Sequence, residues 1–458
     1  MKRFMVIGCV GVVVALCVVA LKGAQKPAVP GVTVAVPPPL PPVERPMGKL
    51  IVHEWGTFTG FAGSDGVHLP FKTLVGSDLP PFVSNRMKQA VGRDPDPVKS
   101  FLAEMVFTKA GGAAAMQRME TPVIYFYADA AGEADVRVDF PAGLLTEFYP
   151  PVRSMAPRFG AAPGEAQLPG DAAPQTQPSM GPYPQSFLDW GRVRIVPQPS
   201  DKQMKGIPAV TDGGHYGFAR ETDSSLVEFT EATGEKHQEK FLFYRGLGNF
   251  TMPVKLSATG GDRFELTNAS PSPLNWAFLI QVSGDGHTPP RFARFEDLAG
   301  HQQLRLPPAA AVQGDLATAL TRSLVGSGLF EKEARAMVQT WKSSWLDEPG
   351  TRVLYIVPRP VTDALLPLRI QPAPDQTVRV LVGRIDVLTP EQEFHLRSMI
   401  MAAGPTTSLS DEDVRLLSGL GRFLAPALER VSQPGGAAAS KQADLLRAAL
   451  SRSLASRK

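Results

Sequence analysis

The sequence predicts an α+β protein, with an antiparallel β-sandwich-like domain first and a mixed α/β region with C-terminal helices after it. Three observations support this class. From residue 50 to about residue 306, apolar residues come in short runs separated by turn residues, which is typical of antiparallel strands. Helical periods with an apolar face follow only after residue 309. The 44 prolines and 42 glycines among 458 residues supply the turns that many short strands need.

The β-rich domain is expected over residues 49–308. Residues 121–127 (TPVIYFY) read as a strand buried on both faces, while residues 135–140 alternate between apolar and charged side chains, as a half-buried strand does. Further predicted strands share this short, turn-bounded pattern: residues 192–196, 225–229, 240–244, 263–267 and 276–282. A proline- and glycine-rich insertion at about residues 155–185 is expected to be disordered.

The C-terminal third combines strands and helices. Residues 309–389 are expected to form an α/β region, with helices at residues 315–325 and 331–345 and core strands at residues 352–357 and 377–383. In the second helix an apolar stripe is formed by Ala334, Met337, Val338, Trp341 and Trp345.

C-terminal helices are predicted over residues 390–432. Thr389, Pro390 and Gln392 form a helix start with an N-cap, a proline at the first position and a capping-box partner. A second helix is expected from Ser410, and residues 433–458 are expected to be a flexible or frayed tail.

The N-terminus predicts export and membrane attachment. Lys2 and Arg3 precede an uncharged, apolar run over residues 4–21, so residues 1–26 are interpreted as a signal anchor with a transmembrane helix. The expected location is the cell membrane, with a single span and an exported C-terminal part. A cleaved signal, giving a secreted or periplasmic protein, is the alternative. Residues 27–48 are proline-rich and read as an extended spacer.

Composition narrows the function classes. A formal net charge of +3 spread over the whole chain does not favour nucleic acid as a partner. Both cysteines, Cys9 and Cys17, lie in the N-terminal segment, which excludes a thiolate zinc site or a cysteine nucleophile in the rest of the chain. Nothing in the sequence requires a cofactor.

Residues 53–68 hold the densest polar chemistry. His53, Asp65 and His68, together with Glu54, are candidate ligands for a divalent metal ion. If residues 49–55 form a strand, His53 and Glu54 point to opposite faces and cannot bind the same ion. The competing interpretation is a His53 imidazole hydrogen-bonded within the sheet.

Three carboxylates beside aromatic or apolar segments are candidate catalytic residues: Glu54, Glu120 and Glu147. A carboxyl group against apolar walls can have a raised pKa, and a pair of them could hydrolyse a glycoside. Their neutralisation in structural ion pairs by Arg118, Arg137 or Arg153 is the alternative.

Binding is the remaining function class. Trp55, Tyr149 and Arg153 are candidate binding residues, because exposed aromatic side chains could stack on sugars or hold a peptide. The sequence therefore favours a ligand- or partner-binding or scaffolding protein, with an envelope glycan or protein as the partner. A glycoside or metal-dependent hydrolase with a site near residues 53–68 is the alternative.

The segments LIVHEWGTFTGFAGSDGVHLPFKTLVGSDLPPFV, RMETPVIYFY, GLLTEFYPPVR and RVLYIVPR resemble an uncharacterised family of membrane-anchored bacterial envelope proteins that share an HEWGTF-type segment. The resemblance spans most of the chain after the spacer. It implies one integral architecture and brings no activity, cofactor or catalytic residue with it.

Overall fold

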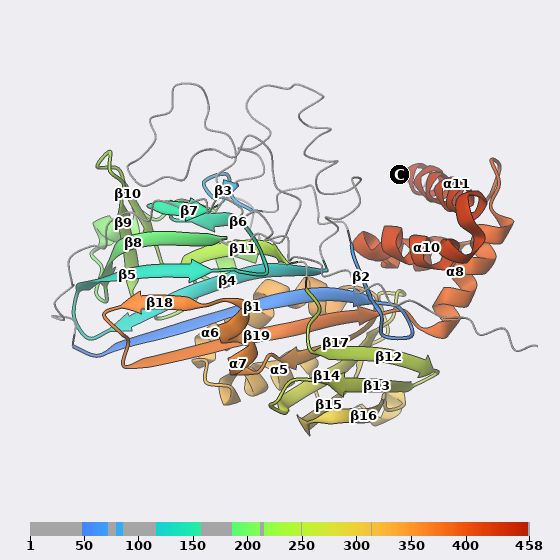
Figure 1. The fold of residues 1–458 in the computed structure, drawn as a ribbon, viewed down its shortest axis with the longest axis horizontal. Helices are drawn as coiled ribbons and strands as arrows, with labels where there is room; N and C mark the ends of the chain where they lie inside the picture. Colours follow the sequence, from blue (N-terminus) through green and yellow to red (C-terminus); the bar gives the residue numbers. More distant parts are fainter. Residues whose placement is uncertain are drawn as a thin grey trace, which may run out of the picture.

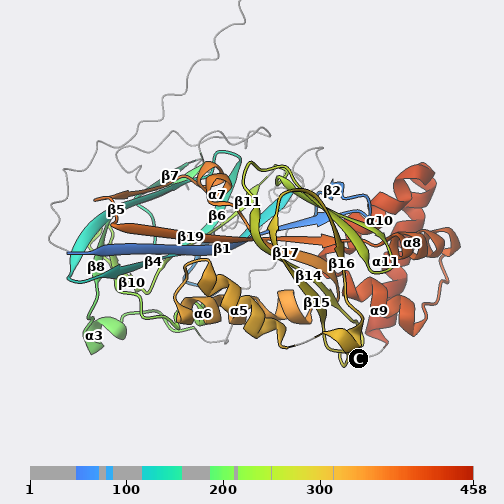
Figure 2. The same ribbon diagram turned by 90° about the horizontal axis from the view of Figure 1, so that it is seen from below.

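The computed structural model describes residues 48–71, 79–85, 116–156, 186–210, 215–248, 250–312 and 314–456. A ten-stranded mixed sheet runs through the described part, with two smaller sheets on one face, helices α5 and α6 on the other, and the last helices at one end (Figures 1 and 2). The α+β class predicted from the sequence is confirmed, including the antiparallel strands and the C-terminal helices.

The ten-stranded sheet has the order β15-β14-β17-β19-β1-β4-β11-β6-β3, with β2 paired to β1. Its strands are β1 (Leu50–Ala62), β2 (His68–Leu69), β3 (Ser84–Asn85), β4 (Gln117–Ala128), β6 (Gly143–Tyr149), β11 (Leu242–Gly248), β14 (Leu274–Val282), β15 (Arg291–Leu298), β17 (Gly350–Ile356) and β19 (Gln376–Val387).

The smaller sheets are antiparallel. One has the order β10-β9-β8-β5-β18, with β7 paired to β8, and the other has the order β12-β13-β16. Their strands are β5 (Gly132–Asp139), β7 (Ser154–Ala156), β8 (Phe187–Val196), β9 (Leu226–Thr230), β10 (Lys236–Glu239), β18 (Leu368–Gln371), β12 (Val254–Gly260), β13 (Arg263–Asn268) and β16 (Gly300–Arg305).

The helices gather mainly after residue 309. The α-helices are α3 (Asp201–Met204), α4 (His215–Phe218), α5 (Leu316–Gly326), α6 (Glu331–Lys342), α7 (Arg359–Leu365), α8 (Pro390–Ala402), α9 (Asp411–Gly419), α10 (Leu424–Ser432) and α11 (Gly436–Ala455). Three short 3₁₀ helices are η1 (Ala309–Ala311), η3 (Gly421–Phe423) and η4 (Gln433–Gly435), and η2 (Ser343–Asp347) is a π-helical turn that continues α6.

One parallel pairing joins the first described strand to the last one. β1 and β19 pair in register from Ile51 with Gln376 to Ala62 with Val387, whereas every other pairing that the structure describes is antiparallel. The sheet therefore crosses the boundary expected between residues 308 and 309, because β17 and β19 lie beside strands of the β-rich region.

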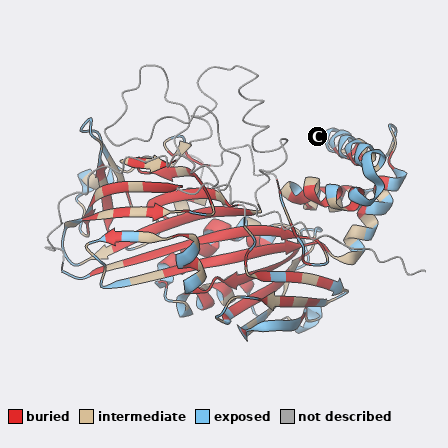
Figure 3. Cartoon of the chain, in the orientation of Figure 1, coloured by how far each residue is buried: buried red, intermediate tan, exposed pale blue. Residues whose placement is uncertain are grey.

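The long central strands of the ten-stranded sheet are mostly buried (Figure 3), and three groups of buried side chains hold the layers together. One lies between the ten-stranded sheet and the smaller sheets, one between the ten-stranded sheet and α5 and α6, and one among the C-terminal helices. The predicted stripe from Ala334 to Trp345 is buried in the second group, as its helical spacing indicates.

The C-terminal helices begin where the sequence predicts but differ in two respects. Thr389 and Ser410 cap α8 and α9 through capping boxes. The helix expected to continue from Ser410 is instead divided into α9 and α10, because Gly421 adopts a positive φ of 47°. The segment expected to be a flexible tail or a frayed helix is helix α11, and it is packed instead of frayed, because Leu446 and Leu450 are buried among the other helices.

The membrane prediction requires correction. The predicted signal anchor, residues 1–26, lies outside the described residues, and so does the predicted spacer, residues 27–48, except for its last residue. Most of the predicted insertion, residues 157–185, also lies outside them. None of the helices that the structure describes is long and apolar enough to cross a membrane. Even α11, with 20 residues, carries exposed Lys441, Asp444 and Arg447. This finding contradicts the predicted transmembrane helix and the single-pass localisation.

Candidate functional site

His53 and Glu54 lie next to each other on β1 and face different layers, as strand alternation predicts. The His53 Nδ1 atom lies 2.7 Å from Oε2 of Glu333 on α6, and the Tyr127 hydroxyl donates to Oε1 of Glu333 at 2.9 Å. The His53 ring also stacks on Phe330, with 4.5 Å between ring centroids. His53 and Glu333 are fully buried, so this group fastens the start of α6 to the sheet.

Glu54 belongs to a buried network on the other face. It accepts hydrogen bonds from the Tyr244 hydroxyl and from Nε of Arg379, its register partner on β19. Arg379 also donates from Nη1 to Asp363 on α7 at 2.8 Å. Burial and the Glu54 charge raise the pKa of Tyr244 well above its usual value, which keeps the phenol protonated as a donor. Glu54 is therefore a structural ion-pair partner.

Glu120 lies in a third network, close to the C-terminal helices. Its carboxylate accepts from Thr59 Oγ1 at 2.8 Å and from Arg422 Nη1 at 2.6 Å, with Arg118 Nε at 3.3 Å. Burial alone would raise the pKa of Glu120, but the charges of Arg422 and Arg118 outweigh it and hold the pKa well below its usual range. A carboxyl group that stays ionised in this way is a poor general acid.

A related buried group lies near the same end of the sheet. Asp386 accepts from Arg352 at 2.9 Å and from Arg384, and Arg384 also donates to Glu348 at 2.6 Å. Burial raises the pKa of Asp386, but Arg384 and Arg352 lower it by more. Arg352 also donates to the carbonyl groups of residues 344, 345, 348 and 349, which joins β17 and β19 to the segment before β17.

The carboxylates predicted to be catalytic are not brought together. Glu54 lies opposite Ile124, four residues from Glu120 along β4, which is roughly 13 Å of strand. Paired glycosidase carboxylates lie about 5 to 9.5 Å apart. Glu147 lies on β6, where it accepts from Asn85 Nδ2 at 3.3 Å and from Thr146.

The predicted metal ligands also have separate partners. His68 lies opposite Ala62, nine residues along β1 from His53, which is roughly 30 Å. The Nε2 atom of His68 lies 3.4 Å from the Val254 carbonyl, and burial lowers the His68 pKa. Asp65 pairs with Arg430 at 3.0 Å.

The predicted binding residues lie mostly in the interior. Trp55 is 0% exposed and Tyr149 is 2% exposed, with the Tyr149 ring packed against Phe82 at 4.8 Å. The Arg153 side chain lies over the backbone of Gly191, within 2.7 Å of where a Cβ atom would stand. These residues offer no exposed aromatic platform.

One set of described residues does have the donor atoms and spacing for a metal ion. Glu231, Glu235 and His237 on the β9–β10 hairpin place one ligand atom each within 4.8 Å of the others. No metal-binding role is predicted for these three residues from the sequence. In the sequence, these residues stand out only as two glutamates and a histidine close together around a short glycine-containing turn.

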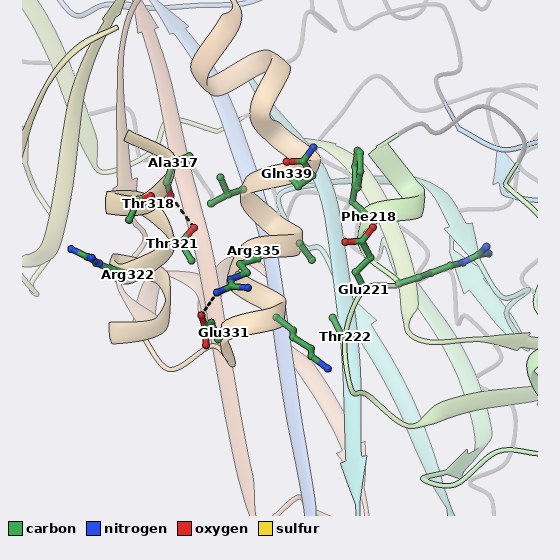
Figure 4. Close-up of a pocket in the computed structure, with 14 residues that line it drawn as sticks. Phe218, Glu221, Thr222, Ala317, Thr318, Thr321, Arg322, Glu331, Arg335 and Gln339 are labelled. Carbon is green, nitrogen blue, oxygen red and sulfur yellow. Dashed lines mark hydrogen bonds and ion pairs between the residues drawn. The ribbon is translucent and has the colours of Figure 1, made fainter. Parts of the chain in front are cut away.

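A surface groove lies over α6, between α5 and residues 218–222; we call it the α5–α6 groove. Its volume is about 1050 Å³. Figure 4 shows Glu331 and Arg335 of α6 between the side chains of α5 and those of Phe218 and Glu221. The lining residues are Phe218, Arg220, Glu221, Thr222, Ala317, Thr318, Thr321, Arg322, Glu331, Lys332, Arg335, Ala336, Val338 and Gln339.

Several groove residues form ion pairs of unequal burial. Arg220 binds Glu239, which is 0% exposed, at 2.6 Å, and burial raises the pKa of that carboxyl group. The Lys332–Asp223 and Arg335–Glu331 pairs are more than half exposed. Exposed ion pairs contribute little to stability, so Lys332 and Arg335 can leave their present partners and bind a ligand at a small cost in free energy.

The groove could not be located from the sequence. Both helices were predicted, but residues 218–222 carry no motif, and only the tertiary fold places them beside α6.

The chain matches no family model and no curated protein. Among solved structures it is similar to the Fcho1 Mu homology domain from Danio rerio with bound Eps15 peptide. The TM-score is 0.24 and the identity is 7%, over 75% of this chain and 96% of that chain. A TM-score this low supports no inference about fold or function, so function must be argued from the chain's own residues.

Proposed function

We propose that the protein is a binding protein whose α5–α6 groove holds an acidic segment of a partner protein. The observation that carries this proposal is the charge of the groove. Among its lining residues, four are cationic, namely Arg220, Arg322, Lys332 and Arg335, and two are anionic, namely Glu221 and Glu331.

The character of the lining favours an extended polar ligand over a small apolar one. Small-molecule pockets are mostly apolar and enclose their ligand, with volumes of about 300 to 1,000 Å³. The α5–α6 groove is slightly larger and carries charged, hydroxyl and amide side chains on two helices. Carboxylates of a partner can bind its guanidinium and ammonium groups, while Thr318, Thr321 and Gln339 supply neutral hydrogen bonds.

The residue types favour a protein partner over a glycan. Sugar stacking would need exposed aromatic faces, and Phe218 is the only aromatic residue in the lining described. Trp55 and Tyr149, the aromatic residues predicted to bind a ligand, are buried, and so is Trp190. The hydrolase alternative gains no support, because Glu54 and Glu120 are each held in separate ion-pair networks.

Fluorescence polarisation with the full chain tests the proposal. The probes are labelled peptides of equal length that are rich in Asp and Glu, or neutral, or rich in Lys. We expect the acidic set to bind, and to bind more weakly as salt is added, because exposed charges are screened. The double variant Lys332→Glu with Arg335→Glu should weaken binding about tenfold or more, a loss of about 1.4 kcal/mol.

A matched control is Arg263→Glu with Arg305→Glu, which makes the same change in net charge on exposed arginines of the three-stranded sheet. This control should bind the acidic peptides like the natural chain. Equal binding of acidic and neutral peptides, or equal loss in both double variants, would contradict the proposal. Binding of an anionic glycan without binding of any peptide would refute the class of partner.

A further inference from the structure

The β9–β10 hairpin, which projects from the body of the protein (Figure 1), carries three potential metal ligands at its tip. Glu231 follows β9, Glu235 precedes β10, and His237 lies on β10 opposite Phe229. The turn between them is closed by a hydrogen bond from the Glu231 amide to the Glu235 carbonyl at 2.8 Å. Folding of this hairpin therefore brings both carboxylates beside the imidazole.

The imidazole is held in place by its neighbours. The side chain of His237 is 16% exposed, and its ring lies edge-on to Tyr149, with 6.1 Å between the ring centroids. Its Nε2 atom is 2.7 Å from Oε1 of Glu231 and 3.9 Å from Oε1 of Glu235. Neither carboxylate has another ion-pair partner among the described residues.

These distances suit a small divalent cation. Donor atoms at about 2.1 Å from a tetrahedral ion are about 3.4 Å apart, between the two Nε2–carboxylate distances observed here. The carboxylate of Glu235 is 69% exposed, so a side-chain rotation is enough to close the set. A cation would also remove the repulsion between the two carboxylates.

We infer that Glu231, Glu235 and His237 form a binding site for a first-row divalent transition ion, with Zn²⁺ the best match. One imidazole nitrogen with two carboxylates is a ligand set that Zn²⁺ accepts. Ca²⁺ needs six to eight oxygen ligands, which this hairpin does not supply. Three protein ligands leave at least one coordination position for water or for a group from another molecule.

Isothermal titration calorimetry of the chelator-treated full chain with ZnCl₂, MgCl₂ and CaCl₂ tests the inference. We expect Zn²⁺ to bind at this site and the other two ions to give no comparable heat. Glu235→Gln alters only an exposed side chain and should weaken Zn²⁺ binding about tenfold or more without loss of folding. His237→Ala should abolish it. Binding of Co²⁺ should give visible absorption bands that are lost in the same variants.

The matched control is His301→Ala, which removes an exposed histidine of β16 and should leave Zn²⁺ binding unchanged. Absence of Zn²⁺ binding to the natural chain would overturn the inference. So would Zn²⁺ binding that persists at full strength in both Glu235→Gln and His237→Ala, because the ion would then sit elsewhere. Neither result depends on the peptide-binding proposal for the groove.

Discussion

Arg379→Met is expected to destabilise the protein strongly. The side chains of Arg379 and Glu54 are 1% and 0% exposed, so the substitution leaves a buried carboxylate with only the Tyr244 hydroxyl as a donor. Removing one partner of a buried ion pair typically costs about 3 to 5 kcal/mol. The expected loss lies in that range, because water cannot reach the remaining charge.

A second substitution, at Glu54, removes the buried negative charge that Arg379→Met leaves without its partner. In the double variant Arg379→Met with Glu54→Gln, the amide oxygen can still accept from Tyr244, and only neutral polar groups remain to be satisfied. Neutral buried groups without partners cost about 1 to 3 kcal/mol. The double variant should therefore be more stable than Arg379→Met alone, by roughly 2 kcal/mol, although it carries one more substitution.

Urea denaturation measured by tryptophan fluorescence gives the free energies of unfolding, since the five tryptophans are all buried. The control is Arg369→Met, which breaks an ion pair whose arginine is 62% exposed and should cost less than about 1 kcal/mol. A double variant less stable than Arg379→Met, or an Arg379→Met loss no larger than that of the control, would refute the charge-burial explanation.

Three further predictions address other parts of the fold. Because the pKa of Glu120 is lowered in the folded state, its ionised carboxylate stabilises the fold above the usual pKa of 4.5, and this stabilisation is lost as the pH falls below 4.5. Glu120→Gln should therefore make the free energy of unfolding fall less steeply with decreasing pH, and an unchanged slope would contradict this prediction. Gly56→Ala would place Cβ 2.9 Å from the Pro122 backbone and should cost about 1 to 3 kcal/mol. Gly326→Ala, in open space on α5, should instead raise thermal stability by up to about 1 kcal/mol, and equal effects of the two alanines would exclude this steric account. Phe394→Ser removes a 70% exposed side chain and should change the unfolding free energy by less than about 0.5 kcal/mol, so a larger loss in the same urea assay would mean that Phe394 is covered.

Local sequence patterns predicted most of the secondary structure because the forces involved are local. The stripe on α6 and the caps at Thr389 and Ser410 depend on residues within a few positions of one another. The parallel pairing of β1 with β19 depends on residues 325 positions apart, as in the Glu54–Arg379 contact. No local pattern encodes such a pairing. For this reason a domain boundary after residue 308 was predicted, and the sheet that β17 and β19 share with the β-rich region was not.

One signal in the sequence pointed to the missing pairings. Arg352, Arg379 and Arg384 lie in strands that are mostly apolar, and a buried guanidinium requires a carboxylate partner. The neutralising partners proposed from the sequence were instead Arg118, Arg137 and Arg153. Of these, Arg118 does reach Glu120, whereas Arg137 binds Asp139 two residues along its own strand. The need for ion pairs was therefore predictable, but the identity of each partner required the tertiary structure.

The polar residues of β1 are best explained by the number of layers that this one strand must join. His53 binds α6 through Glu333, Glu54 binds β19 through Arg379, and Thr59 shares Glu120 with Arg422 of η3. Glu333, Arg379 and Arg422 all come from the last third of the chain. Apolar contacts alone would hold these layers together without fixing their register, whereas a buried charge is stable only against its own partner. The chemistry concentrated in residues 53–59 therefore joins layers of the fold, and binding activity is better sought at the α5–α6 groove and the β9–β10 hairpin.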